Sequence, residues 1–419
     1  MRKNTKLLAI LSVFAMLIVG TIPFMDSSDA TVGDGGTYSY TLVYNSSEMG
    51  NTAAQETQLT VAGMTPISHA ANTTTLTALA NQGSWTWDYN ATTHEGSGLG
   101  PFNSFYAAFD IDNGNAFVTK LNPYNLGQDL TGTALPSGNY NIMWVLPTVY
   151  WKVVDGNVTL TNDSTAGGTA YAHTIDGHVY NYVAYGVYQG TGDASTPTKL
   201  TSESGKMPIV SKTRAQFRTL ADNYTMDSGL GANAYSMLWN FYQWELYKLV
   251  SYTVMEGFNS QNFVGNGHVY GSTYTFQTGA LDTYGPYAGN PGMITDSTTG
   301  TSYGSDQDKL FIEGAWGGIN QFVDGVVING NSGYYIDTKS VPDDSTTAGT
   351  YVTYVQESLP ASSGFPLNIS TNEKVWGMGT DNSGSATTGL TDKTYTATSG
   401  SKVLFVGGSS GTDASYSVV

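Results

Sequence analysis

Two stretches of the chain carry apolar residues at a helical period. In the first, Arg214 to Asn223, the side chains of Phe217, Leu220 and Ala221 share one face. Ser211 or Thr213 precedes this run and is a candidate N-cap, because a hydroxyl there accepts a hydrogen bond from a free N–H of the first turn. The pattern predicts a short amphipathic helix.

The second helical pattern is longer. Its apolar positions fall at i, i+3, i+4, i+7, i+11, i+14 and i+15, which are Tyr235, Leu238, Trp239, Tyr242, Leu246, Leu249 and Val250. Met237, Phe241 and Trp244 make the opposite side apolar as well. Because a helix that is apolar all round is buried, we expect this one at the centre of the main core rather than as a cofactor-binding face.

Elsewhere apolar and polar residues alternate over short runs broken by Gly, Asn and Thr, which predicts β-strands. Pro147 punctuates one run and makes it a strand pair or a bent strand, and Asp155-Gly156-Asn157 predicts a hairpin turn. No repeat of solenoid or propeller length occurs. The expected strands are Thr37–Tyr44, Ser84–Tyr89 (with Trp85, Trp87 and Tyr89 on one face), Asn141–Trp151, Val158–Leu160, Val179–Tyr188 and Lys402–Val406.

The N-terminal thirty residues have the pattern of a secretory signal peptide. Arg2, Lys3 and Lys6 are followed by an uncharged apolar run to Phe24, and Ala30 ends a stretch of small residues. An uncleaved membrane anchor is the alternative, since the run has about the minimum length that spans a bilayer. The small residues favour cleavage near Ala30, and with it a secreted or cell-surface location. No later run is long and apolar enough to span a membrane, so we expect no span in the mature chain.

The chain divides without a clear linker. Residues 1–30 are the expected signal peptide, residues 31–101 a small β-rich N-terminal region, and residues 102–419 the main domain. Short strands with two helices among them predict an α+β fold that is mostly β.

Composition narrows the partners. The chain has 16 basic and 33 acidic residues, a net charge of -17, and only 12% charged residues. Nucleic acid is therefore not an expected partner, because phosphate binding needs clustered Lys and Arg. The few charges leave a surface that forms hydrogen bonds through hydroxyls, amides and phenols, as on many extracellular β-domains. With 29 Tyr and 8 Trp there is ample aromatic mass for a core.

Cysteine is absent. An exported chain of this kind gains no stability from disulfides, and thiol nucleophiles and Cys-ligated metals are excluded. Seven Asn-X-Ser/Thr sequons are candidate N-glycosylation sites, a number that this Asn-, Ser- and Thr-rich composition also gives by chance. They are Asn45, Asn72, Asn90, Asn157, Asn162, Asn223 and Asn368.

Candidate catalytic chemistry is sparse. His173 and His178 flank Asp176-Gly177, a turn, and lack a recognisable third ligand, so the pattern favours structural histidines over a zinc site. Asp110-Ile-Asp112-Asn-Gly114 matches a calcium loop only in part. We therefore expect no metal, no cofactor and no enzymatic activity.

Three carboxylates lie in apolar stretches of the sequence: Glu245, Glu256 and Glu313. The setting of Glu313 beside the Trp316 loop favours a buried hydrogen-bond acceptor over a catalytic acid.

A series of short motifs runs in order from Asn141 to Ser410. They are Tyr150–Lys152, Tyr185–Tyr188, Ser202–Pro208 with Thr213–Arg218, Asn259–Gln261 with Gly265–Gly267, Thr278-Gly279 with Gly285–Gly289, Phe311–Gly317 with Phe322–Gly325, Leu390–Asp392 and Val403–Ser409. Their order resembles a C-type-lectin-like fold, of the kind shared by formylglycine-generating-enzyme-like domains and phage tropism-determinant-like domains. The whole chain is also similar to exported adhesin-like proteins of methanogenic archaea. Within these motifs, Asp324-Gly325 is a predicted turn pair.

The chain departs from the family pattern in two ways. It lacks the reactive Cys pair of the sulfatase-activating members, so the resemblance implies no such activity. Only Gly411 to Val419 remain where the family has further strands, so its last strands are either missing or replaced.

The resemblance also implies ligand binding by loops and short strands near the C-terminal end. The residues expected to contact a ligand are Trp376, Asp381, Asn382, Tyr395, Ser409, Ser410, Asp413 and Tyr416.

Three functional hypotheses follow. The first is a cell-surface binding or adhesin-like protein that recognises a glycan or protein on another cell or host. The second is an envelope component that associates with copies of itself, and the third is a secreted hydrolase.

Overall fold

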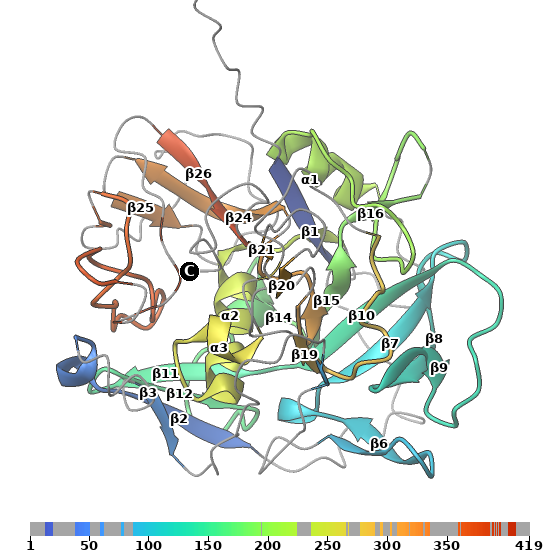
Figure 1. Cartoon of the computed structure of the whole chain (residues 1–419), viewed down its shortest axis with the longest axis horizontal. Helices are drawn as coiled ribbons and strands as arrows, with labels where there is room; N and C mark the ends of the chain where they lie inside the picture. Colours follow the sequence, from blue (N-terminus) through green and yellow to red (C-terminus); the bar gives the residue numbers. More distant parts are fainter. Residues whose placement is uncertain are drawn as a thin grey trace, which may run out of the picture.

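The computed structural model describes residues 13–19, 38–50, 59–62, 77–78, 87–193, 195–223, 236–264, 267, 277–289, 294–295, 302–303, 308–317, 319–329, 332–335, 359–360, 362–385, 388, 390, 392, 394 and 401–407. The fold is α+β and mostly β, as predicted, with several antiparallel sheets around a central helix (Figure 1). No helix of this described part is long and apolar enough to cross a membrane.

The largest sheet has ten strands. Its path is β25 (Ser332–Tyr335), β24 (Asn320–Asn329), β1 (Val13–Val19), β15 (Tyr182–Gln189), β10 (Tyr140–Pro147), β7 (Phe105–Asp110), β8 (Ala116–Asn122) and β9 (Asn125–Asp129). The short strand β18 (Met237–Leu238) pairs with β1, and β26 (Ser401–Val406) pairs with β24. The contact between β1 and β24 is parallel, and the other pairings of this sheet are antiparallel.

A four-stranded sheet joins the N-terminal region to the middle of the chain. Its order is β11 (Tyr150–Val154), β12 (Asn157–Thr161), β2 (Ser39–Tyr44) and β3 (Leu59–Ala62). Pro147 is the last residue of β10, and Thr148 and Val149 separate it from β11, which lies in a different sheet; the predicted run is therefore two strands and not one bent strand. Asp155 and Gly156 both have positive φ, at 52° and 80°, as expected for the predicted hairpin turn.

The predicted boundary at residue 101 does not separate two cores. Tyr40, Leu42 and Trp87 belong to the same hydrophobic cluster as the central helix. Trp87 stacks on Tyr106, with ring centroids 5.2 Å apart and planes 8° apart. The described N-terminal strands are therefore part of the main fold.

Small sheets complete the described strands. One has the order β23 (Ile312–Glu313), β22 (Lys309–Leu310), β19 (Tyr287–Gly289) and β4 (Thr77–Ala78). The two-stranded ones are β5 (Asp88–Asn90) with β6 (Glu95–Leu99), β13 (Thr174–Ile175) with β14 (His178–Val179), β16 (Thr191–Gly192) with β17 (Leu200–Thr201), and β20 (Ile294–Thr295) with β21 (Ser302–Tyr303).

Helix α1 (Arg214–Asp222) confirms the first helical prediction. Thr213 is its N-cap and forms a capping box with Gln216, in which each side chain bonds the other residue's backbone N–H. Phe217, Leu220 and Ala221 are buried, as the pattern indicated.

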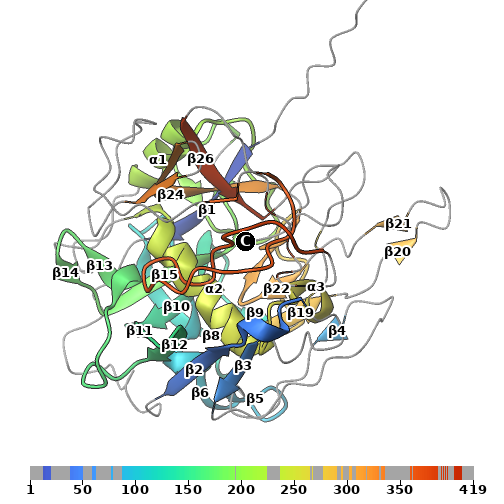
Figure 2. The same cartoon turned by 90° about the vertical axis from the view of Figure 1, so that its left-hand side faces the viewer.

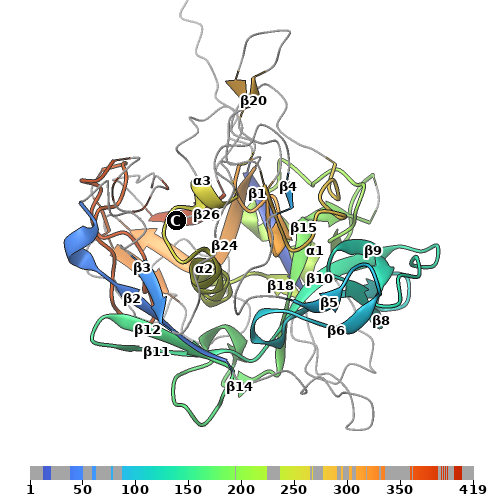
Figure 3. The same ribbon diagram turned by 60° about the horizontal axis from the view of Figure 1, so that its bottom comes forward.

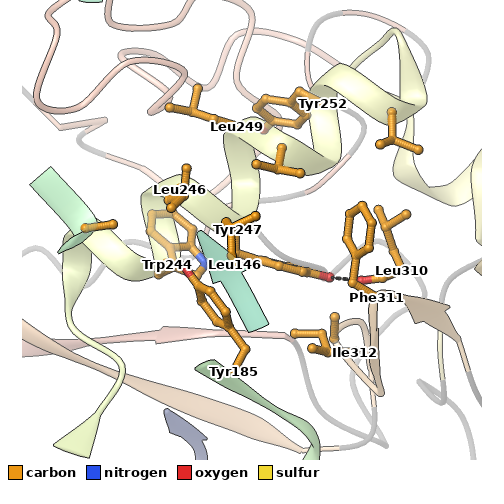
Figure 4. Close-up of a cluster of buried hydrophobic side chains, with 14 of the residues drawn as sticks. Leu146, Tyr185, Trp244, Leu246, Tyr247, Leu249, Tyr252, Leu310, Phe311 and Ile312 are labelled. Atoms are coloured by element: carbon orange, nitrogen blue, oxygen red, sulfur yellow. Dashed lines mark hydrogen bonds between the residues drawn. The ribbon is translucent and has the colours of Figure 1, made fainter. Parts of the chain in front are cut away.

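Helix α2 (Phe241–Met255) confirms the second prediction, although it begins later than the apolar pattern. Asn240 caps it through a capping box with Gln243, and all fifteen of its residues are buried. Figure 3 shows α2 at the centre, with strands of both larger sheets around it. In Figure 4 its side chains Trp244, Tyr247 and Leu249 point in different directions, and Tyr247 donates a hydrogen bond to the carbonyl of Leu310 at 3.1 Å. A one-turn helix, α3 (Ser260–Phe263), follows.

The predicted turn at Asp324-Gly325 is wrong. Both residues lie inside β24, where the pairing with β26 shifts register between Val323 and Val327 and Gly325 has a φ of 71°. The residue pair therefore makes an irregularity within the strand. Asp324 is buried and accepts two hydrogen bonds from Arg218 of α1, at 2.9 Å and 2.8 Å.

The ion pair between Arg218 and Asp324 joins α1 to the large sheet, and a substitution can measure how much it stabilises the protein. Replacing Arg218 by Met leaves a buried carboxylate without its bidentate partner, which should lower the free energy of unfolding by about 3 to 5 kcal/mol. Lys206→Met removes a lysine whose side chain is 48% exposed, 3.8 Å from Glu203, and should cost at most about 1 kcal/mol. Denaturant unfolding of both variants measures the difference, and equal costs would contradict the assignment.

Candidate functional site

The candidate site is the C-terminal loop segment, residues 362–385. It contains no helix or regular strand; its ladder contacts are isolated bridges, Gly364 with Thr394, Ile369 with Gly379 and Ser385 with Thr388. It lies beside the four-stranded sheet and crosses the face that Figure 2 presents. Binding residues concentrate in loops that a rigid scaffold holds in place. The contacts that fix the C-terminal loop segment therefore bear on whether it can bind a ligand.

Glu373 ties the C-terminal loop segment to the four-stranded sheet. Its carboxylate accepts hydrogen bonds from the Tyr171 hydroxyl at 2.8 Å and from the backbone N–H of Val153 at 3.2 Å. Its carbonyl accepts the indole N–H of Trp151 at 3.0 Å. Three groups from β11 and the turn at Tyr171–His173 thus converge on one residue.

Trp376 is a second tie, and its predicted role as a ligand contact is corrected. The side chain is fully buried, and its indole N–H donates to the Gly156 carbonyl at 2.9 Å. Its own carbonyl accepts a hydrogen bond from the Lys248 amine of α2 at 3.0 Å. A buried ring offers no surface to a ligand, so Trp376 anchors the segment instead.

Asp381 and Asn382, also predicted to contact a ligand, bond within the segment. Asp381 accepts hydrogen bonds from the Leu367 N–H at 3.0 Å, from the Asn368 side-chain amide and from the Ser383 N–H. Asn382 donates to the Ser362 carbonyl and accepts from the Thr394 hydroxyl. Both side chains are half-buried, and these contacts fix the path of the loop.

The remaining predicted ligand contacts, Tyr395, Ser409, Ser410, Asp413 and Tyr416, lie outside the described residues, as does the sequon at Asn72. Asp392 belongs to the motif Leu390–Asp392. Its two carboxylate oxygens accept the Ser260 hydroxyl at the start of α3, at 2.9 Å and 2.8 Å. This third tie is buried.

Sequence reasoning missed Glu373. It belongs to no periodic apolar pattern, and its partners lie more than two hundred residues earlier in the chain. No local signal marks it, because the closeness of β11 to this segment arises only in the folded chain.

The fully exposed residues of the C-terminal loop segment are all polar and uncharged. Its exposed residues are Ser362, Ser363, Asn368, Thr371, Asn372, Ser383 and Ser385. A fixed backbone that presents hydroxyls and amides can bind a polar ligand through several short contacts.

Glu373 can be tested as an anchor. Glu373→Ala should lower the free energy of unfolding by about 1 to 3 kcal/mol, because it leaves the Val153 N–H and the Tyr171 hydroxyl without their acceptor. Hydrogen exchange should speed up at Val153 and across residues 362–385. Thr371→Ala alters an exposed residue of the same segment and should change neither quantity. Unchanged exchange in Glu373→Ala would show that the segment is held by other contacts.

Two groups of buried charges lie on α2 and around Glu313. On α2, Glu245 and Lys248 form an ion pair of 2.9 Å, and the Lys248 amine lies 4.9 Å from the centre of the Trp244 ring. Burial raises the pKa of Glu245 to about 7, with Lys248 opposing part of the shift, and burial lowers the pKa of Lys248. Every side chain of this helix is covered, so the pair has no open side for a substrate.

The second group surrounds Glu313. Its two carboxylate oxygens accept the backbone N–H groups of Gly279 at 2.8 Å and Leu281 at 3.1 Å, so the prediction of a buried hydrogen-bond acceptor is confirmed. Burial raises the pKa of Glu313 to about 7, and burial lowers the pKa of the neighbouring Lys309 to about 8. Lys309 donates to the Leu281 carbonyl at 3.2 Å. These bonds hold the loop of residues 279–281 against β22 and β23.

The structure places His173 and His178 in different surroundings. They flank the predicted turn, which is confirmed by positive φ at Asp176 and Gly177, but the His173 ring is buried and His178 is exposed. Among the described residues, no three His, Cys, Asp or Glu side chains gather to hold a metal ion. Burial lowers the pKa of His173 to about 3, with the Tyr180 backbone opposing part of the shift.

This shift of the His173 pKa predicts a pH dependence of stability. Between pH 6.5 and about 3 the unfolded chain binds a proton that the buried ring does not. The free energy of unfolding should therefore fall on acidification through this range, by up to about 1.4 kcal/mol per pH unit from this residue. His173→Phe should flatten the slope by that amount. His178→Gln replaces an exposed ring and is the matched control; parallel slopes for wild type and His173→Phe would refute the prediction.

No family model matches the chain, and neither a curated protein nor a solved structure matches it significantly. The role of the candidate site therefore has to be inferred from its own geometry.

Proposed function

We propose that this protein is an exported cell-surface binding protein that recognises a glycan or protein ligand with its C-terminal loop segment. The observation that carries the proposal is that residues 362–385 lack regular secondary structure and are nevertheless tied to the core through Glu373 and Trp376. A loop fixed in this way loses little conformational entropy when a ligand binds.

The chemistry of the exposed residues supports a polar, uncharged ligand surface. Thr371, Asn372 and Ser383 offer hydroxyl and amide groups that both donate and accept hydrogen bonds, which suits glycan hydroxyls and peptide backbone equally. The net charge of -17 disfavours polyanions. Tyr395, which the family resemblance adds to this surface, would supply a ring for stacking.

Binding is a better proposal than hydrolysis because three buried acids form bonds that stabilise the fold. Glu313 accepts backbone N–H groups, Glu245 pairs with Lys248, and Asp324 pairs with Arg218. A glycosidase needs two carboxylates facing a substrate across an open site. The proposal also follows the C-type-lectin-like resemblance, in which loops near the C-terminal end carry ligands.

Export by the N-terminal signal is part of the proposal, and cleavage of the signal would change the ten-stranded sheet. The structure places Val13–Val19 as β1 between β15 and β24, so cleavage near Ala30 would remove one strand. Other contacts link the two halves of the sheet independently of β1. Gln189 of β15 and Gln321 of β24 both donate to the Gly314 carbonyl, at 3.0 Å and 2.9 Å, so this carbonyl bridges the strands on either side of β1.

The test is a glycan and surface-protein array screened with the exported chain, after mass analysis has established whether its N-terminus is Thr31. Thr371→Arg places a large charged side chain on the exposed loop without removing a core contact, and should weaken a selective interaction at least about tenfold, equal to 1.4 kcal/mol. Tyr395→Ala tests the position that the resemblance adds. The variants are compared by surface binding measurements.

Thr219→Arg, on the exposed side of α1, is the matched control and should bind as wild type. A ligand that binds equally well to Thr371→Arg would place recognition elsewhere. Absence of any ligand together with concentration-dependent assembly in solution would favour the self-associating envelope component instead.

A further inference from the structure

The described sequons differ in how their carboxamides are used. Asn157 and Asn162 are half-buried and accept the backbone N–H groups of Tyr44 at 3.0 Å and Tyr38 at 2.8 Å, which closes the ends of strand β2. Asn45 is also half-buried and accepts the Ser47 hydroxyl. These side chains take part in the four-stranded sheet or border it.

Two exposed sequons use the atom that a glycan would occupy. The Nδ2 of Asn223 donates to the Thr198 carbonyl at 3.0 Å, and the Nδ2 of Asn368 donates to Asp381 inside the C-terminal loop segment. A sugar on either nitrogen would compete with a bond that fixes a loop.

Asn90 is different. It is exposed at the end of β5, directly before the turn of residues 91–94 that leads into β6. Its Oδ1 accepts the backbone N–H of Thr92 at 2.9 Å and of Thr93 at 3.2 Å. This orients the carboxamide, while the Nδ2 makes no hydrogen bond to the described residues. Thr92, the hydroxyl residue of the sequon, is exposed as well.

The hairpin that carries Asn90 is well fixed. The Tyr89 hydroxyl donates to the Leu130 carbonyl at 2.9 Å, and Asp88 accepts the N–H and the hydroxyl of Ser97. The acceptor is therefore displayed on an ordered turn, where a large substituent meets solvent rather than the core.

We propose that Asn90 is an N-glycan acceptor, which rests on the proposed export of the chain. In the transfer, the Asn90 Nδ2 forms a bond to the anomeric carbon of a lipid-linked oligosaccharide. The bond from that carbon to the lipid phosphate breaks, the lipid phosphate leaves with the bonding electrons, and the amide nitrogen loses one proton to a base of the transferase. The Oδ1 contacts with Thr92 and Thr93 need not change.

The position is compatible with ligand binding at the C-terminal loop segment. In Figures 1 and 3 the hairpin of β5 and β6 and the orange-red loop of residues 362–385 lie on opposite sides of the molecule. A glycan on Asn90 therefore leaves the loop open, whereas one on Asn368 would cover it.

The experiment places the full chain behind an established secretion signal in cells that N-glycosylate proteins, and maps glycopeptides of the secreted protein by mass spectrometry. The heterologous signal makes the result independent of the chain's own leader. Asn90→Gln and Thr92→Ala each destroy the sequon, and Thr93→Ala is the matched control, because it changes the adjacent exposed threonine and keeps the sequon.

The expected result is a glycan on the Asn90 peptide of wild type and Thr93→Ala, and its complete loss in Asn90→Gln and Thr92→Ala. Secreted wild-type protein with an unmodified Asn90 peptide would overturn the proposal, whichever other sequons are occupied. Either result leaves the ligand-binding proposal untouched, because that proposal is tested by the array and by Thr371→Arg.

Discussion

The burial of α2 on every side is the constraint on which the rest of the fold depends. A helix without a polar face must be covered all round, so strands from distant parts of the chain have to pack against it. β2 comes from the N-terminal region, β15 from the middle and β24 from the last third. Tyr185 of β15 shows how close this packing is, since its hydroxyl donates to the Gln243 carbonyl inside the helix at 3.0 Å.

Aromatic side chains with a polar end take the place of covalent cross-links in this cysteine-free chain. Tyr106 donates to the Phe311 carbonyl at 2.7 Å, and Trp151 and Trp376 reach Glu373 and Gly156 across more than two hundred residues. Each of these rings is fully buried and also satisfies a backbone carbonyl that would otherwise lose its contact with water. Such bonds are directional, so they fix register between segments in a way that apolar packing alone does not.

The sequence predicted what depends on local chemistry. The capped helix at Thr213 and the hairpin at Asp155-Gly156 each follow from residues close together in the sequence, and the apolar pattern from Tyr235 to Val250 predicted the buried helix, although it placed the start before Asn240. It failed where distant partners decide. Asp324-Gly325 is a strand irregularity because Arg218 and β26 meet it there, and no local rule contains that information.

The candidate site divides in the same manner. The exposed Ser, Thr and Asn of the C-terminal loop segment could be inferred from composition. The inward role of Trp376 could not be inferred from the sequence. A tryptophan in a Gly- and Ser-rich stretch is equally consistent with a binding platform and with an anchor. Only the meeting of Gly156, Lys248 and Phe258 around it decides between the two.

In the proposed binding function, inward anchors and outward polar residues of the C-terminal loop segment would have separate roles. Glu373 and Trp376 point to the core and hold the backbone, whereas Thr371 and Asn372, beside them in the chain, point outward. Substitution at the outward positions changes which groups a ligand meets and leaves the anchoring bonds intact. The entropy cost of ordering the loop is met during folding, so the interaction energy with a ligand goes into affinity and selectivity. The aromatic core thus lets the loop keep its shape when an outward residue such as Thr371 is substituted.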